Sequence, residues 1–226
     1  MISVVSMHWK RTDNTHRILA SLKNSKVVND VIIWNNNPDV YFQAEPWVRV
    51  VNTSQDFGLN TRFGAALYAK NDCVLTIDDD NLIPEGTINN LYVKWKSNQK
   101  IIHTLDGRVP TDKNEYGHDV MLGHNKEMVE APMSMTRCAM YHRKYAAKYF
   151  DVWRDLQGDL KHSVDGNGED LMMSYLISAA SGKKHRVYRY PRTELPAPHA
   201  IHGKAGHKEF RTELMRRCQQ YFNIRQ

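Results

Sequence analysis

The stretch Cys73-Val74-Leu75-Thr76-Ile77-Asp78-Asp79-Asp80 decides the fold class, because a short β-rich run ends there in three consecutive carboxylates. Like charges packed at a strand end repel one another. A divalent cation relieves that repulsion, since hard cations such as Mg²⁺ and Mn²⁺ take carboxylate oxygens as ligands. An acidic triplet taken alone is more often a solvated turn. The surrounding sequence has to decide between these two interpretations.

The first hundred residues alternate short β-rich runs with helical segments, a pattern typical of a mainly parallel sheet with crossover helices. Strands are expected at 2–7, 30–35, 47–51, 73–78 and 101–105, and helices at 13–23, 60–70 and 84–97. The acidic triplet then lies between a strand and a helix, at the carboxyl edge of the sheet, where open parallel sheets bind ligands. Alternation along the strand can place Asp78 and Asp80 on the same side of the backbone.

The second half of the chain has a less regular pattern. Residues 106–126 are rich in Gly, Asp, Asn and His and predict a long loop or an irregular hairpin. Helices are expected at about 142–155, 169–181 and 207–222, with strand-like pieces near 128–136 and 185–190. Neither a linker nor an internal repeat separates the halves. We therefore expect one α/β domain over residues 1–226, with a mixed, mainly parallel sheet flanked by helices.

Composition narrows the class of protein. The chain has 226 residues, of which 41% are hydrophobic, and this is enough for one globular domain with a proper core. Its 31 Lys and Arg against 25 Asp and Glu give a net charge of +6, which favours phosphate-rich partners. No basic stripe interleaved with aromatic residues is present, so a nucleic-acid interface is not expected.

Targeting signals are also missing from the sequence. No apolar run approaches the ~20 residues that cross a bilayer, and no basic segment precedes the first apolar run. Three cysteines, scattered without a metal-binding spacing, predict neither a disulfide framework nor a zinc site. A cytoplasmic location is therefore the expectation, and the oligomeric state is left open.

A second acidic element stands at Asp165-Gly166-Asn167-Gly168-Glu169-Asp170, before an apolar helix. Its glycines permit a tight turn, and Glu169 and Asp170 would lie at a positive helix end. A helix start decorated with acids is the simpler interpretation. Together with the triplet, however, this element favours an active site.

Three further segments carry candidate ligand-binding side chains. Arg11, at the start of the first helix, is suited to a phosphate, although Thr12 or Asp13 may equally be only an N-cap. Asn35 and Asn36 offer the donor and acceptor pairs that read a pyrimidine edge, but Asn is also an ordinary turn residue. Three histidines lie among Pro and Gly near the C-terminus, and two of them are candidate metal ligands. These two are His199 and His202, and the third is His207.

Several short motifs, taken in order, resemble one known family. Arg-Thr-Asp, Trp-Asn-Asn, Leu-Asn-x-Arg-Phe and Asp-Asp-Asp are followed by Glu-Asp at the start of a helix. With these, residues 2 to 180 resemble the exostosin-like glycosyltransferases (GT64-type), which have the Rossmann-like GT-A fold. The chain is similar as well to small glycosyltransferase modules of large algal viruses, which would make it an enzyme of a viral or bacterial-type pathway.

The resemblance implies a role for each matching residue. Arg11, Asn35, Asn36, Asn60 and Arg62 would hold the uridine and the diphosphate of a UDP-sugar. Asp78 and Asp79 would contact ribose or sugar, Asp80 would bind Mn²⁺ or Mg²⁺, and Asp170 with Glu169 would stand beside the anomeric centre. Residues 1–105 would form the half that binds the nucleotide sugar, and residues 106–226 the half that binds the acceptor.

The implied activity is metal-dependent transfer of a hexose from a UDP-sugar to a hydroxyl of a glycan acceptor. Retention is favoured only because the family retains, and an inverting reaction, with Asp170 as the general base, stays open. Two other functions are kept open. A sugar-1-phosphate nucleotidyltransferase also uses an α/β sheet and a carboxylate-bound metal, and a basic glycan or nucleic-acid binder needs no catalysis. The C-terminal arginine of the family has three candidates here, which are Arg192, Arg211 and Arg216.

Overall fold

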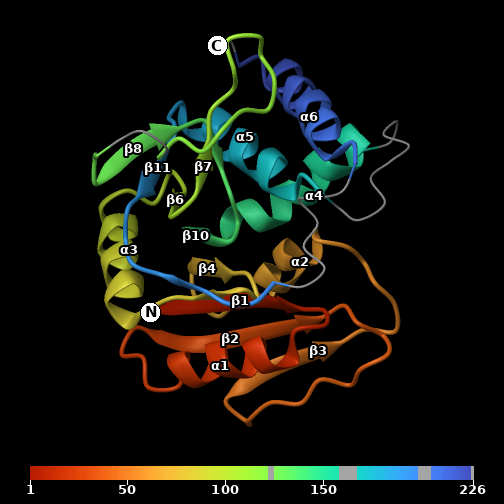
Figure 1. The fold of residues 1–226 in the computed structure, drawn as a ribbon, viewed down its shortest axis with the longest axis vertical. Coiled ribbons are helices and arrows are strands. Elements are labelled where there is room, and N and C mark those ends of the chain that lie inside the picture. The colour runs from red at the N-terminus through yellow and green to blue at the C-terminus, as the bar shows by residue number, and fades with distance from the viewer. Residues whose placement is uncertain (122–124, 158–166, 198–204, 225–226) are drawn as a thin grey trace.

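A mixed sheet of eight strands organises the computed structural model, which describes residues 1–121, 125–157, 167–197 and 205–224 (Figure 1). Its strand order is β3 (Val48–Asn52), β2 (Val28–Asn35), β1 (Ile2–His8), β4 (Cys73–Ile77), β10 (Cys138–His142), β6 (His103–Thr104), β11 (His185–Tyr188) and β8 (Met128–Ala131). The first four of these strands are mutually parallel, whereas β10 runs antiparallel to both of its neighbours. The expected α/β domain with a mainly parallel mixed sheet is thus confirmed.

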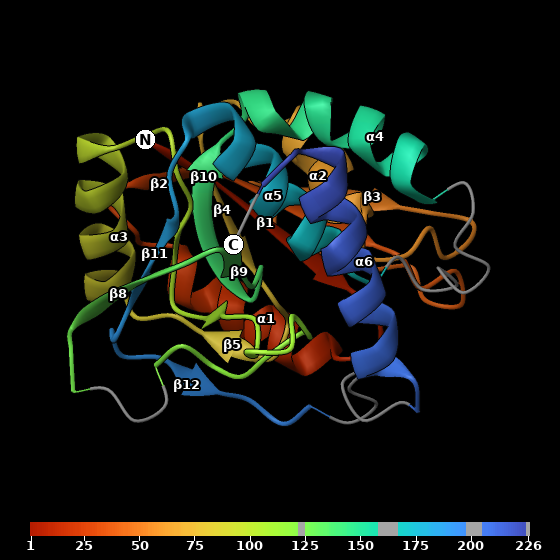
Figure 2. The same cartoon turned by 90° about the horizontal axis from the view of Figure 1, so that it is seen from above.

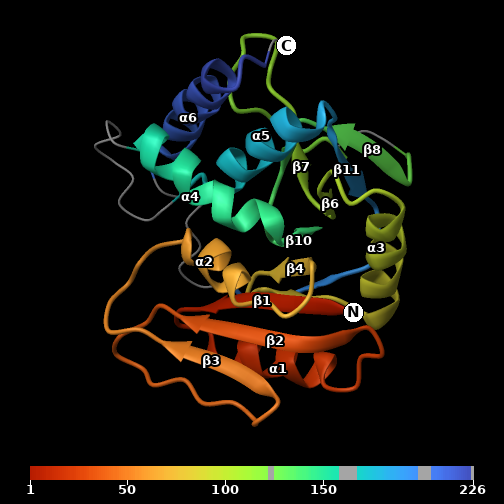
Figure 3. The same cartoon turned by 180° about the vertical axis from the view of Figure 1, so that it is seen from behind.

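Six helices cover the two faces of this sheet. They are α1 (Thr12–Leu22), α2 (Thr61–Leu67), α3 (Glu85–Ser97), α4 (Lys144–Gln157), α5 (Glu169–Ser181) and α6 (His207–Tyr221). Figure 3 shows α4, α5 and α6 grouped at one end of the molecule and α1 at the other. Two small sheets complete the fold, one made by β5 (Asn81–Leu82) with β12 (Thr193–Glu194), the other by β7 (Gly107–Arg108) with β9 (Met133–Ser134).

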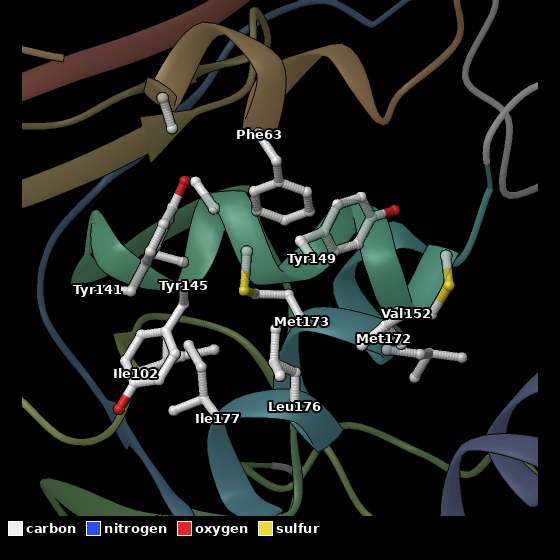
Figure 4. Packing of buried hydrophobic residues seen from close by; sticks show 14 of the residues in the cluster. Phe63, Ile102, Tyr141, Tyr145, Tyr149, Val152, Met172, Met173, Leu176 and Ile177 are labelled. Carbon is white, nitrogen blue, oxygen red and sulfur yellow. The ribbon is translucent and has the colours of Figure 1, made fainter. Parts of the chain in front are cut away.

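Strand alternation divides the buried side chains into two main clusters. Val5 and Val74 face a cluster with α2, α4, α5 and α6, while Val4 and Leu75 face another with α1 and α3. In the first cluster the rings of Phe63 and Tyr149 lie 4.4 Å apart between α2 and α4 (Figure 4). This packing holds α2 against α4 on the face of the sheet that carries Val5 and Val74.

Strand β10 is the main departure from the sequence-based expectations. The strand-like structure expected near 128–136 is confirmed by β8 and β9, but no strand was expected at Cys138–His142, where β10 lies, and α4 begins at Lys144 instead of about residue 142. The first four residues of β10 are apolar and buried in the centre of the sheet, and the strand shows no period of two, so periodicity does not reveal it. The helix expected at 60–70 is also shorter, at Thr61–Leu67.

The acidic triplet follows β4 directly. The strand ends at Ile77, and the N–H of Asn81 donates to the carbonyl of Asp78 at 3.1 Å, so the chain turns within the triplet. The expected alternation therefore does not continue to Asp80. Among the described residues, none of the helices has the length and apolar character needed to span a membrane.

Candidate active site

A cleft of about 890 Å³ opens at the carboxyl ends of β1 and β4. Arg11 and the acidic triplet line one part of it, and the starts of α5 and α6 line another. Figure 2 views the same elements from above, with α5 and α6 on one side of β1 and β4 and α1 on the other. Segments that are far apart in the sequence therefore meet at the edge where a parallel sheet binds its ligands.

Arg11 joins two carboxylates of the triplet. Its guanidinium lies 2.5 Å from Asp79 Oδ1 and 3.3 Å from Asp80 Oδ2. Burial, together with the neighbouring carboxylates, raises the pKa of Asp79 to about 6 even though Arg11 acts in the opposite direction. The pKa of Asp80 is raised as well, mainly by burial and by Asp78. The triplet is thus more buried than the solvent-open loop we expected, and it would be stabilised by a further cation.

Arg62 connects the triplet to the second acidic element. Its Nη1 lies 2.7 Å from Asp78 Oδ1, and its Nε lies 3.2 Å from Glu169 Oε1. Glu169 also accepts a hydrogen bond from Thr136 Oγ1 at 3.1 Å. Burial raises the pKa of Glu169 against the opposing effect of Arg62. A buried cation therefore lies between the two groups of acids.

Arg211 holds Asp170 on the far side of the cleft. Its Nη2 lies 2.7 Å from both carboxylate oxygens, and its Nη1 donates to Asn167 Oδ1 at 2.9 Å. The Tyr116 ring covers the guanidinium, with its centroid 4.5 Å from Arg211 Cζ. Asp170 Oδ1 also accepts the N–H of Leu171 at 2.8 Å. The orientation of the Asp170 carboxylate is thereby fixed before any ligand binds.

Gly168 explains how α5 can start so close to α6. It has a φ of +97°, in the left-handed region that glycine adopts readily. A Cβ at this position would lie 2.3 Å from Leu214 Cδ2. Glycine is therefore required both by the backbone conformation and by the close approach of α6, which carries Arg211.

Most of the sequence-predicted site residues line the cleft. They are Arg11, Asn36, Arg62, Asp78, Asp79, Asp80, Glu169 and Asp170. Asn36 donates its amide to Gly58 O at 2.9 Å and to Thr61 Oγ1 at 3.0 Å. Its Oδ1 is buried and has no hydrogen-bond partner in the described part of the chain. A buried polar atom without a partner is uncommon in folded proteins, so this oxygen is a notable feature of the cleft wall.

Two predicted nucleotide-binding residues do not line the cleft. Asn35 is buried, and its side chain bonds to His8 and Asn52 at 2.8 Å each, so it holds β1, β2 and β3 together. Asn60 is buried at the start of α2, where it accepts a hydrogen bond from the Tyr149 hydroxyl. Both side chains bond to other side chains of the domain.

The histidine predictions have different outcomes. His199 and His202 lie outside the described residues, so their proposed metal ligation is not tested. His207 does line the cleft, with Nδ1 2.9 Å from Asn167 Nδ2.

Of the three candidates for the C-terminal arginine, Arg211 is the one in the cleft. Arg192 pairs with Asp106, and Arg216 donates to Asn114 O at 2.9 Å.

Sequence reasoning missed Tyr116, Thr136 and Arg137, which also line the cleft. Tyr116 lies in the segment that was expected to be a loop or an irregular hairpin, and the other two precede the unexpected strand β10. No short motif marks any of them. Thr136 and Arg137 could be identified only by the pairing of β10 with β4, and Tyr116 only by its contact with Arg211. Both observations require the tertiary structure.

The donor set fits a metal that shares its coordination with a ligand. Within the described ranges, no cluster of three or more His, Cys, Asp or Glu side chains is placed to hold an ion. Asp79 and Asp80, whose pKa values are raised, are the carboxylates of the triplet that a metal there would take as ligands. Mg²⁺ and similar cations in phosphate-binding sites are held in this way, with waters and phosphate oxygens as the remaining ligands.

The α/β fold and this cleft are consistent with a GT-A-like sugar-transferring enzyme. Residues 2–225 match the model of the Glycosyl transferase family 64 domain, and the chain belongs to that family. This membership agrees with the family that the motifs predicted.

Curated relatives agree with this assignment. An exostosin-like-3 homolog of Caenorhabditis elegans is 25% identical over 82% of this chain, which spans 23% of that protein. Glycosylinositol phosphorylceramide mannosyl transferase 1 of Arabidopsis thaliana is 26% identical over 73% of this chain, which spans 50% of that protein. Exostosin-1a of Danio rerio is 29% identical over 49% of this chain, which spans 15% of that protein. The chain thus covers at most half of the length of these relatives.

Proposed function

We propose that this glycosyltransferase moves a sugar from a UDP-sugar to a hydroxyl of a glycan acceptor, that it requires Mn²⁺ or Mg²⁺, and that it retains the anomeric configuration. The observation that carries the proposal is that both acidic elements line the same cleft, where Arg62 bridges Asp78 to Glu169, next to Asp170. This arrangement places a cation-attracting group and a fixed carboxylate on either side of one ligand-sized space.

The donor would lie along the part of the cleft that the first 105 residues form. The unsatisfied Oδ1 of Asn36 is suited to accept the N–H of a uracil ring. Arg11 stands at the start of α1, where a guanidinium and a helix N-terminus together favour a diphosphate. Asp78 and Asp79 are suited to accept hydrogen bonds from ribose or sugar hydroxyls.

Asp80 is the residue we assign to the metal. It is the last acid of the triplet, and the residues after it pair with β12 at the edge of the cleft. A divalent ion bound there would neutralise charge on the departing diphosphate. His199 and His202 are proposed as additional ligands.

Asp170 is the residue we assign to the anomeric centre. Positive charge develops on the sugar as its bond to the phosphate oxygen breaks, and a fixed carboxylate stabilises that charge without reorganising. Because Arg211 occupies both oxygens of Asp170, this carboxylate is poorly placed to accept a proton as a general base. We therefore favour retention, in which the acceptor oxygen bonds to the same face of the sugar and the acceptor proton passes to the departing phosphate oxygen.

The test is a panel of UDP-sugars with Mn²⁺ and an oligosaccharide mixture, followed by measurement of released UDP. At least one donor should give metal-dependent release, and Asp80→Asn should abolish it. Asp72→Asn is the matched control, since Asp72 is an exposed acid paired with Arg143 before β4, away from the cleft. Pyrophosphate release from a sugar 1-phosphate and UTP would instead indicate a nucleotidyltransferase. Salt-sensitive polyanion binding without turnover would indicate a non-catalytic binder.

A further inference from the structure

Arg137 is a cation of the cleft that no motif predicted and that the proposed chemistry does not yet use. It precedes β10, and its Nη2 lies 3.1 Å from Glu194 Oε1 and 3.9 Å from Asp80 Oδ1. About a third of its side chain, 34%, is exposed. Its guanidinium is therefore accessible from the cleft and close to the residue assigned to the metal.

The backbone of Arg137 is fixed to the triplet. Its carbonyl accepts the N–H of Asp78 at 3.0 Å, and Cys138 continues the pairing with Ile77. These bonds involve only the main chain, so they persist whatever side chain stands at the position. A substitution of Arg137 therefore removes the guanidinium without moving the triplet.

The present partner of Arg137 is one that a ligand can replace. Glu194 is 62% exposed, and an exposed ion pair contributes little to stability, about 0–1 kcal/mol. Glu194 also has a second cation, Arg192, at 3.4 Å, so it keeps a partner when Arg137 leaves. A phosphate oxygen would form a stronger, charge-assisted bond with the guanidinium than this exposed carboxylate does.

Charge balance points to the kind of ligand. A divalent ion on Asp80 and the guanidinium of Arg137 would repel each other at this separation, unless an anion lies between them. The anion that the proposed reaction brings to Asp80 is the diphosphate of the donor. We propose that Arg137 binds the distal phosphate of that diphosphate, beside the metal position, and stabilises it as the leaving group.

This inference rests on the proposed function, and nucleotide binding tests it independently of turnover. We would measure the dissociation constants of UDP and UMP by calorimetry, in Mn²⁺ and in EDTA. Arg137→Ala should weaken UDP binding about tenfold or more, as expected for loss of a charge-assisted hydrogen bond, and change UMP binding less than about twofold. The change should persist in EDTA, and Arg137→Lys should restore part of the affinity in a more salt-sensitive form.

Two more variants complete the experiment. Glu194→Gln removes the competing carboxylate and should strengthen UDP binding, the opposite of Arg137→Ala. Arg143→Ala is the matched control, because Arg143 is a similarly exposed arginine paired with Asp72 outside the cleft, and it should leave the ratio of UDP to UMP affinity unchanged.

Each contrary result has a separate meaning. Equal losses for UDP and UMP in Arg137→Ala, or weaker UDP binding in Glu194→Gln, would make the Arg137–Glu194 pair structural and overturn the inference. Unchanged UDP binding in Arg137→Ala would show that the guanidinium does not contact the diphosphate and would also overturn the inference. If the unmodified protein binds neither nucleotide, the proposed function itself fails.

Discussion

The two acidic elements of the cleft are held in different ways. Asp79 and Asp80 share the guanidinium of Arg11, and their side chains keep 12% and 17% of their surface exposed. The other two cations near the triplet, Arg62 and Arg137, also pair with acids outside it, Glu169 and Glu194. Asp170 pairs with the guanidinium of Arg211. Both side chains are more deeply buried, with 7% of the Asp170 side chain and 5% of the Arg211 side chain exposed. The triplet is therefore short of positive charge, whereas the pair formed by Asp170 and Arg211 is balanced.

Because of this difference, we expect the triplet to exchange its partners and the pair formed by Asp170 and Arg211 to stay fixed. Carboxylates that lack full compensation attract a metal and its phosphate ligands, which arrive and leave in each catalytic cycle. A carboxylate held at both oxygens keeps one orientation throughout. The contrast predicts that mutations in the fixed pair affect stability most and that mutations in the triplet affect ligand binding most.

The largest effect on stability is expected from breaking the fixed pair. Arg211→Met leaves the buried charge of Asp170 uncompensated and should lower the free energy of unfolding by about 3–5 kcal/mol. Urea denaturation followed by circular dichroism measures this loss. The double variant Asp170→Asn with Arg211→Met removes both charges and should lose less than the sum of the single losses. Strict additivity would show that the two side chains are not coupled.

A second prediction contrasts the acids with two buried histidines outside the cleft. Burial lowers the pKa of His103 and of His185 from 6.5 to about 4. His185 Nδ1 accepts the N–H of Ile102 at 3.2 Å, and Nε2 lies 2.9 Å from Ser174 O, so only the neutral ring fits. As the pH falls, each histidine is protonated in the unfolded chain at a higher pH than in the folded protein. The free energy of unfolding therefore decreases by about 3 kcal/mol per histidine as the pH falls from 6.5 toward 4.

Unfolding midpoints measured between pH 7 and pH 4 test this slope. His185→Gln should be less stable than the unmodified protein at pH 7 but should show a shallower decline on acidification. An unchanged decline in this variant would assign the acid sensitivity to other groups.

The Asp79 carboxyl should change stability with pH in the opposite direction to the two histidines, and by a smaller amount. Its pKa in the folded protein, about 6, is above the ordinary value of 3.8, so the folded state binds the proton more tightly. Stability from this group is thus present below pH 3.8 and is lost as the pH rises through 6. In EDTA at pH 7, Asp79→Asn should raise the free energy of unfolding by about 1–3 kcal/mol. A clear loss of stability there would mean that Arg11 compensates the triplet fully.

The smallest effect on stability is expected at Asp80. Asp80→Asn should change the free energy of unfolding by less than about 0.5 kcal/mol, because it keeps the shape of a partly exposed side chain. The same variant should lose the stabilisation that Mn²⁺ with UDP gives to the unmodified protein in a thermal melt. If the variant melts far below the unmodified protein without ligands, the triplet is a structural element and the contrast between the two acidic elements fails.

The sequence predicted the part of the cleft that the first 105 residues form better than the part that later residues form, for a physical reason. Parallel strands joined by helices keep their ligand-binding residues directly after each strand, so Arg11 and Asp78 could be recognised from local pattern. Strand β10 is short, buried on both faces and antiparallel to its neighbours, and its sequence lacks the alternation that reveals a strand. Thr136 and Arg137 were missed together with it.

Side-chain partners were also hidden from the sequence. The Asn35 side chain could equally well read a base or hold a turn, and only the positions of His8 and Asn52 decide that it packs inside. The pairing of Arg211 with Asp170 spans 41 residues, so Arg211 remained one of three candidates until α6 was placed against α5.

The late position of α6 in the chain has a consequence for biosynthesis. A nascent chain on the ribosome would have made Asp170 and most of the cleft before Arg211 emerges. Until then the buried carboxylate has no counter-ion, and the partly synthesised protein carries an incomplete site. The docking of α6 therefore completes this part of the cleft, because it brings the guanidinium of Arg211 to Asp170.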